Sequence, residues 1–170
     1  AEKRLSHGLS LLGNYTWSRN IGNVDENAGF GDNQIYQDYY NRRLDKGPST
    51  IDIVHVFTWS SVYDLPWGKG RRWLSSGALS TLLGGWAVGS IVNMRSGGPF
   101  TIVMQTNTTN AFSAGGLRAN VLRDANLPAG QRTVDRWFDT EAFQAPPQLA
   151  FGNAGRGIVR GDGCVSFAFS

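Results

Sequence analysis

Residues 51–63 have the sequence IDIVHVFTWSSVY, and this stretch decides the fold class. Its odd-numbered positions carry mostly large apolar or aromatic side chains, and its even-numbered positions carry smaller side chains, several of them polar. A period of two places successive side chains on opposite faces of a β-strand. The stretch therefore predicts a long strand, which we place at residues 50–64, with one apolar face that includes Ile51, Ile53 and Phe57.

The same alternation returns elsewhere in the chain. Residues 5–18 have Leu9, Leu11, Tyr15 and Trp17 at positions of one parity, which predicts another long strand. Membrane-spanning strands need about 9–11 residues, and both stretches are long enough. Further strands are predicted at residues 85–105, with a kink at the SGGP of 96–99, and at 164–170, where every second residue is apolar.

The composition favours strands and turns over helices and offers no catalytic centre. Charged residues make up 17% of the 170-residue chain, below the roughly 25% of soluble domains, and 22 glycines are present. The single cysteine, Cys164, excludes an internal disulfide, and the two histidines, His7 and His55, have no predicted metal-binding neighbour. We expect no enzymatic activity, no metal and no other cofactor.

Two long polar stretches separate the predicted strands. Residues 19–49 and 106–163 are rich in glycine, asparagine and proline and are predicted to be long loops, whereas the other connections are short. Alternating long and short connections are typical of an antiparallel up-and-down barrel in the outer membrane, whose long loops face outward. The prediction is an all-β chain of one domain over residues 1–170. In the first loop, Tyr36, Tyr39 and Tyr40 are candidates for ligand contact.

The connection after residue 63 combines cations with tryptophans. Two interpretations are possible: a nucleic-acid contact through phosphates and stacking, or an anchor at the surface of a lipid bilayer. Aromatic rings at headgroup level beside snorkelling cations favour the anchor, and we expect no nucleic-acid partner. The predicted interfacial anchor consists of Trp67, Lys69, Arg71, Arg72 and Trp73.

Several strings, taken in order, resemble the C-terminal part of the barrel of TonB-dependent outer-membrane receptors. The resemblance is closest to the carboxypeptidase-regulatory-like (Oar-like) branch. The most specific string is VYDLPWGKGRRW at residues 62–73, preceded by DIVHVF at 52–57. Others are LSLLGNYTWSR at 9–19, LGGW at 83–86, SGGPFT at 96–101, DRWF at 135–138 and FGNAGR at 151–156.

This resemblance implies a place in the bacterial outer membrane and a share in the energised uptake of a ligand. The plug domain, most of the barrel and the strand expected after Ser170 have no counterpart in the sequence. The chain is therefore expected to be a segment of barrel wall with two ligand-facing loops, whose partners are the rest of its barrel and lipid. The alternative is a secreted or released β-rich protein whose strand edges pair between copies to form an extracellular filament.

Overall fold

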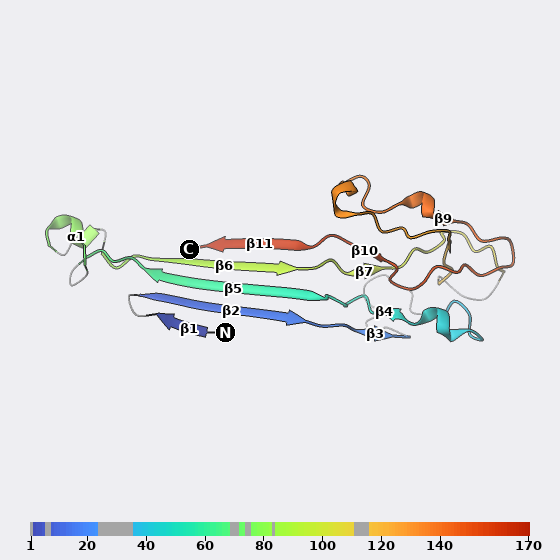
Figure 1. Ribbon diagram of the computed structural model, residues 1–170, viewed down its shortest axis with the longest axis horizontal. Helices are drawn as coiled ribbons and strands as arrows, with labels where there is room; N and C mark the ends of the chain where they lie inside the picture. Colours follow the sequence, from blue (N-terminus) through green and yellow to red (C-terminus); the bar gives the residue numbers. More distant parts are fainter. Residues whose placement is uncertain are drawn as a thin grey trace. The chain divides into compact units, whose positions relative to one another are not determined.

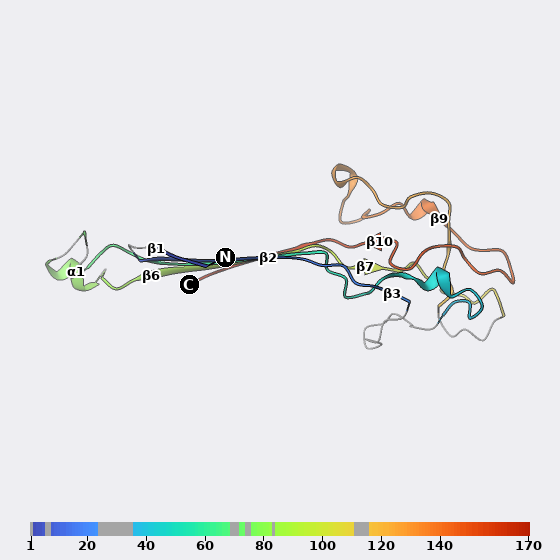
Figure 2. The ribbon, with the colours of Figure 1, turned by 60° about the horizontal axis from the view of Figure 1, so that its bottom comes forward.

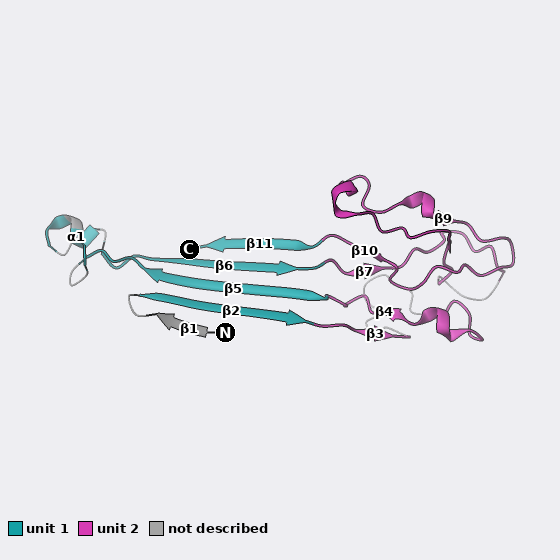
Figure 3. Ribbon diagram, in the orientation of Figure 1, with its two compact units in different colours: residues 1–17, 54–96, 163–170 teal, residues 18–53, 97–162 magenta. Residues whose placement is uncertain are grey.

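The computed structural model describes residues 2–5, 8–23, 36–68, 72–73, 76–82, 84–110 and 116–170, except for the side chains of residues 2–5 and Leu79. The chain divides into two compact units, shown in different colours in Figure 3. Unit 1 comprises residues 1–17, 54–96 and 163–170, and unit 2 comprises residues 18–53 and 97–162. The long segments that link the strands of unit 1 thus form a unit of their own.

Unit 1 is built on one antiparallel sheet of five strands in the order β1-β2-β5-β6-β11. The views in Figures 1 and 2 show these strands as a single layer. Every neighbouring pair is antiparallel, which confirms the predicted all-β antiparallel fold class. The strands are β1 (Glu2–Leu5), β2 (Leu9–Trp17), β5 (His55–Asp64), β6 (Ala87–Arg95) and β11 (Cys164–Phe169).

The register of the strands gives the sheet two chemically different faces. Tyr15 pairs with Phe57, Phe57 with Met94, and Met94 with Val165, so these side chains share one face. This face, called here the aromatic face, carries every aromatic residue of β2, β5 and β11: Tyr15, Trp17, Phe57, Trp59, Tyr63, Phe167 and Phe169. The charged residues of β2, β5, β6 and β11, Asp64 and Arg95, lie on the opposite, polar face.

Two features allow small residues to sit within this sheet. Gly13 of β2 is opposite Trp59 of β5, and a Cβ atom added to Gly13 would lie 3.3 Å from the indole ring. The ring therefore covers the glycine, a common way to stabilise glycine in a strand. Ser61 and Ser90 are also direct partners, and their hydroxyl oxygens form a hydrogen bond of 2.7 Å on the aromatic face.

Strand limits differ from the prediction in three places. The strand predicted at 5–18 begins at Leu9, because Leu5 belongs to β1 and Gly8 lies in the turn that joins β1 to β2. The strand predicted at 50–64 begins at His55, because Asp52 turns into a hydrogen-bonded cluster of unit 2 and the amide of Ile53 bonds the carbonyl of Ile51. Ile51 and Ile53 are therefore not part of the aromatic face. The strand predicted at 85–105 ends at Arg95, because the glycines of the 96–99 segment lead the chain out of the sheet.

A short connection joins β1 to β2, and a longer one over residues 65–86 joins β5 to β6. Gly8, with φ of +81°, belongs to the first and accepts a hydrogen bond of 2.8 Å from the Asp64 amide. Left-handed backbone of this kind favours glycine. The second contains the short helix α1 (Ala78–Leu82). Among the described helices, none is long and apolar enough to cross a membrane.

Unit 2 contains short strands and single helical turns around a small core. Its strands form three two-stranded ladders: β3 (Ile21–Gly22) with β4 (Gly47–Pro48), β7 (Pro99–Phe100) with β10 (Val159–Arg160), and β8 (Asn120–Val121) with β9 (Phe143–Gln144). Its 3-10 turns are η1 (Arg42–Asp45), η2 (Ala129–Gln131) and η3 (Thr140–Ala142). The core groups the buried Ala125, Ala142 and Val159 with Phe100, Ile102, Phe138, Phe143 and Ile158.

Candidate functional site

The three predicted tyrosines lie on one turn of unit 2 together with an arginine that sequence reasoning missed. The rings of Tyr36 and Tyr39 meet edge to face with centroids 5.4 Å apart. The guanidinium carbon of Arg42 lies 5.0 Å from the Tyr36 centroid and 5.1 Å from the Tyr39 centroid. Both distances are within the range of a cation–π interaction. The adjacent Tyr40 is fully exposed, so the turn presents aromatic and cationic groups side by side.

Local hydrogen bonds fix the shape of this turn. The Asp38 carboxylate accepts a hydrogen bond of 2.9 Å from the Tyr40 amide, and the Asp38 carbonyl accepts one of 3.1 Å from the Asn41 amide. Aspartate bonded to the backbone two residues onward is a common turn-forming arrangement. The helical turn η1 follows directly and begins at Arg42. The positions of Tyr39, Tyr40 and Arg42 are therefore set by a hydrogen-bonded backbone.

Buried polar residues hold the tyrosine turn against the second long segment. Gln37 is 2% exposed; its amide nitrogen donates to the Gly152 carbonyl at 2.8 Å, and its amide oxygen accepts from the Arg118 backbone at 2.6 Å. The Arg118 side chain, also buried, donates to the Leu44 carbonyl at 2.8 Å and lies 3.0 Å from the Asp45 carboxylate. Gln37 and Asp45 are buried, whereas Tyr39 and Tyr40 close to them in the chain are exposed, so these inward contacts hold the turn in place at the surface.

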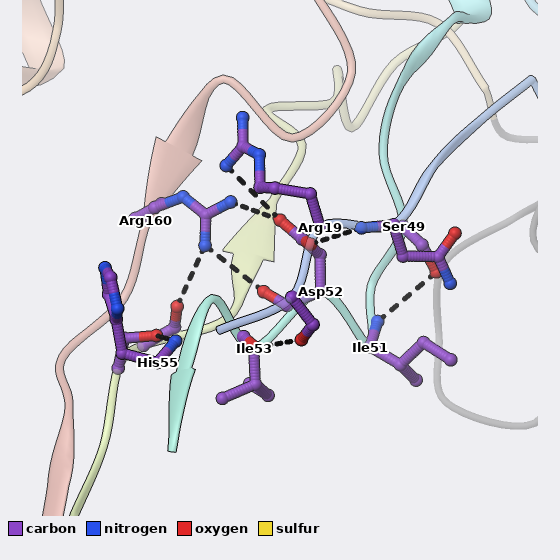
Figure 4. A network of polar contacts seen from close by, with 11 residues as sticks. Arg19, Ser49, Ile51, Asp52, Ile53, His55 and Arg160 are labelled. Carbon is purple, nitrogen blue, oxygen red and sulfur yellow. Dashed lines mark hydrogen bonds and ion pairs between the residues drawn. The ribbon is translucent and has the colours of Figure 1, made fainter. Parts of the chain in front are cut away.

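A second cluster, centred on Asp52, joins the same two segments (Figure 4). The Asp52 carboxylate accepts hydrogen bonds from the Asn20 amide at 2.6 Å, from Arg160, and at 3.5 Å from Arg19. Arg160 also donates to the carbonyls of Asp52 and Gly97, at 3.2 Å and 3.3 Å. The arrangement, called here the Asp52 clasp, connects four stretches of unit 2 through the Asp52 carboxylate and the Arg160 guanidinium.

The clasp keeps its aspartate ionised. Burial by itself raises the pKa of Asp52, but the hydrogen bonds from Asn20 and Arg160 and the charges of Arg160 and Arg19 outweigh burial, so the pKa lies below its ordinary value. An ionised carboxylate beside two guanidiniums forms charge-assisted hydrogen bonds, which are among the strongest in proteins. The clasp is thus a structural element of the loop unit, and its residues are not free to take a ligand.

The predicted interfacial anchor is described in part. Trp67 and Trp73 are bridge partners, with hydrogen bonds from the Gly68 amide to the Trp73 carbonyl at 3.2 Å and from the Trp73 amide to the Pro66 carbonyl at 3.1 Å. Trp73 and Arg72 are exposed, whereas Trp67 is half-buried. Lys69 and Arg71 lie outside the described residues. The described part therefore places the backbones of the two tryptophans side by side in unit 1, and the anchor role stays a prediction.

A sheet whose aromatic side chains all lie on one face, opposite a mostly small and polar face, has the design of a wall between lipid and water. The comparison with known families agrees: the model of the family described as outer membrane beta barrel domain matches residues 1–170. The chain belongs to this family. Searches of curated proteins and of solved structures returned no match.

Membership in the outer membrane β-barrel family assigns the two faces of the sheet. We expect the aromatic face to meet lipid, because a barrel of this kind alternates apolar-out and polar-in along each strand. The role of unit 1 is that of barrel wall in the bacterial outer membrane. At one end of this face, the Tyr15 hydroxyl and His55 Nδ1 form a hydrogen bond of 2.8 Å beside Trp17, which pairs with His55. In outer-membrane barrels, aromatic residues near the ends of the strands lie at the membrane–water interface and form girdles around the barrel.

Proposed function

We propose that the chain is a segment of a TonB-dependent receptor, in which unit 1 forms part of the barrel wall and unit 2 contacts the ligand on the outer side. The observation that carries the proposal is that the two long segments between strands fold together, through the Gln37 and Asp52 contacts, into one unit with an exposed aromatic surface. Loops that are ordered by a scaffold and carry exposed aromatic residues are a common design for binding. In this proposal the protein transports and does not catalyse.

The proposed partners are further barrel strands and lipid. In the described part of the sheet, β1 and β11 each pair with a single neighbour, and bacterial barrels use at least about eight strands. Unpaired strand edges are not tolerated in lipid, because the backbone groups there have no water to bond. Additional strands beside β1 and β11 would satisfy those groups.

The same edges could instead pair between copies in a filament, but the aromatic face argues for the barrel. A filament in water would need a second apolar surface to cover that face, whereas a bilayer covers it directly. Size-exclusion chromatography in detergent and negative-stain electron microscopy in plain buffer separate the two. Detergent-dependent, monodisperse particles support the barrel, and ordered filaments in buffer would support self-assembly.

Energy coupling is tested by genetics in the organism that carries the chain. We expect a strain that lacks the protein to lose growth on one limiting nutrient from a panel, and a strain that lacks TonB to show the same loss. The double mutant should grow no worse than either single mutant, because both act on one route. A growth defect of the protein-deficient strain that increases further when TonB is removed would contradict TonB-dependent uptake.

A further inference from the structure

The turn that carries the tyrosines has an outward positive charge. Arg42, Arg43 and Lys46 are all exposed, and none of them forms an ion pair with any of the described carboxylates. The neighbouring Asp45 does not compensate them, because its carboxylate points inward to Arg118. Exposed cations without acidic partners are available to an anionic ligand, and arginine suits carboxylates because its planar fork can donate two parallel hydrogen bonds.

The Arg42 side chain is already ordered before a ligand arrives. Its guanidinium carbon lies within cation–π range of both Tyr36 and Tyr39, and no described acceptor takes a hydrogen bond from its side chain. Two cation–π contacts restrict a flexible side chain, and they do not use its N–H groups as hydrogen-bond donors. A group held in its binding geometry loses less entropy when it binds, so Arg42 is the best placed of the three cations.

Beside Arg42 the turn offers flat aromatic surface. Tyr39 is 64% exposed and Tyr40 is fully exposed, although the Tyr40 backbone is fixed by Asp38. Tyrosine provides a large, rigid, amphipathic contact area at low entropic cost, which is why it dominates many binding loops. A ligand that uses both features carries an acidic group for Arg42 and a ring for Tyr39 or Tyr40.

We propose that the surface formed by Tyr36, Tyr39, Tyr40, Arg42, Arg43 and Lys46 binds a carboxylate-bearing ligand with a ring that stacks on tyrosine. This inference rests on the proposed ligand-contact role of unit 2 and names the chemical class of the ligand. Two sources share this chemistry: an acidic saccharide and an aromatic acid. Arg42 receives the carboxylate, Arg43 and Lys46 add long-range attraction, and the exposed tyrosine ring packs on the ligand ring.

The test uses the full chain in detergent micelles and isothermal titration calorimetry with three probes. Trigalacturonic acid represents the acidic saccharide, its methyl ester is the uncharged counterpart, and benzene-1,3,5-tricarboxylate represents the aromatic acid. The variants are Arg42→Gln and Tyr40→Ala. The matched control is Arg132→Gln, because Arg132 also stacks on an aromatic ring of unit 2, 5.4 Å from the Trp137 centroid.

We expect at least one acidic probe to bind, and the ester to bind at least about tenfold more weakly than the acid if the saccharide is the ligand. Arg42→Gln should weaken acid binding by about tenfold or more, Arg132→Gln should not change it, and added salt should weaken it. If only one of the two acidic probes binds, that result shows whether the ligand is an acidic saccharide or an aromatic acid.

Three results would overturn the inference: no binding of either acid, equal binding of acid and ester, or an Arg42→Gln variant indistinguishable from Arg132→Gln. The proposed function is judged separately. If Tyr40→Ala weakens acid and ester alike while Arg42→Gln changes neither, the carboxylate class is wrong and the tyrosine contact stands. The TonB growth test uses none of these probes, so it can fail or succeed independently.

Discussion

Arg118 and Asp45 form a buried ion pair that is not fully satisfied. Arg118 Nη2 lies 3.0 Å from Asp45 Oδ1, with 3% and 10% of the two side chains exposed. Among the described residues, Arg118 Nε and Nη2 and Asp45 Oδ2 have no hydrogen-bond partner of good geometry. A pair of this kind gains Coulomb energy but does not recover the full desolvation penalty of its charges. We attribute to this ion pair a role in holding residues 45 and 118 in one specific contact, and not a gain in the free energy of unfolding.

Removing one member of this pair should destabilise unit 2 far more than removing both. Arg118→Met leaves the Asp45 carboxylate buried without a counter-charge and should destabilise unit 2 by about 3–5 kcal/mol. Asp45→Leu combined with Arg118→Met should recover most of that loss, because neither charge is then buried. Hydrogen exchange measured by mass spectrometry over residues 116–122 reports the local stability. Equal protection in the single and double variants would contradict this account.

The Asp52 clasp should open in acid. The pKa of Asp52 lies below its ordinary value of 3.8 in the folded protein, so its ionisation stabilises the fold fully above that value. The contribution is lost as the pH falls below 3.8 and through the lower folded-state pKa. Limited proteolysis of unit 2 by pepsin across this window should show increasing cleavage near residues 18–22 and 159–162. Asp52→Asn should cleave readily at every pH tested; retention of the wild-type pH profile in that variant would exclude Asp52 as the titrating group.

The serine pair on the aromatic face should show strong non-additivity. Ser61→Ala leaves the Ser90 hydroxyl without its partner on the aromatic face, and we expect a loss of about 0.6–1.7 kcal/mol. The double variant Ser61→Ala with Ser90→Ala should be more stable than either single variant, since no unsatisfied hydroxyl remains. Urea unfolding from lipid vesicles, followed by tryptophan fluorescence, measures these differences. Additive losses would mean that the two hydroxyls do not depend on each other.

We expect position 152 to tolerate no side chain and position 155 to tolerate an alanine. A Cβ atom on Gly152 would overlap the carbonyl oxygens of Arg118 and Ala119, while one on Gly155 meets no described atom within 4 Å. Both changes to alanine add the same methyl group, so Gly155→Ala is a matched control. Gly152→Ala should destabilise unit 2 by roughly 1–3 kcal/mol, the usual range for overpacking. Thermal proteolysis of the two variants gives the comparison, and similar midpoints would rule out the tight contact at Gly152.

The alternation of side chains with a period of two made the strands of unit 1 predictable from the sequence. Side chains alternate across a strand, so the parity of Tyr15, Phe57 and Phe167 assigns each to a face before any partner is known. The register of the sheet then places them together on the aromatic face. The ends of the strands were less predictable, because Ile51 and Ile53 continue the alternation but leave the sheet where Asp52 meets Arg160.

Sequence by itself determined which side chains of a strand share a face, because alternation depends only on residues close together in the chain. Only the tertiary structure decided that the two long segments form one unit. Gln37 meets Gly152 and Asp45 meets Arg118 across long sequence separations, and no periodic pattern announces such pairs. The reason is physical: alternation encodes which side of a strand a residue faces, whereas a contact between irregular segments depends on complementary shape and hydrogen bonding that appear only when both are folded.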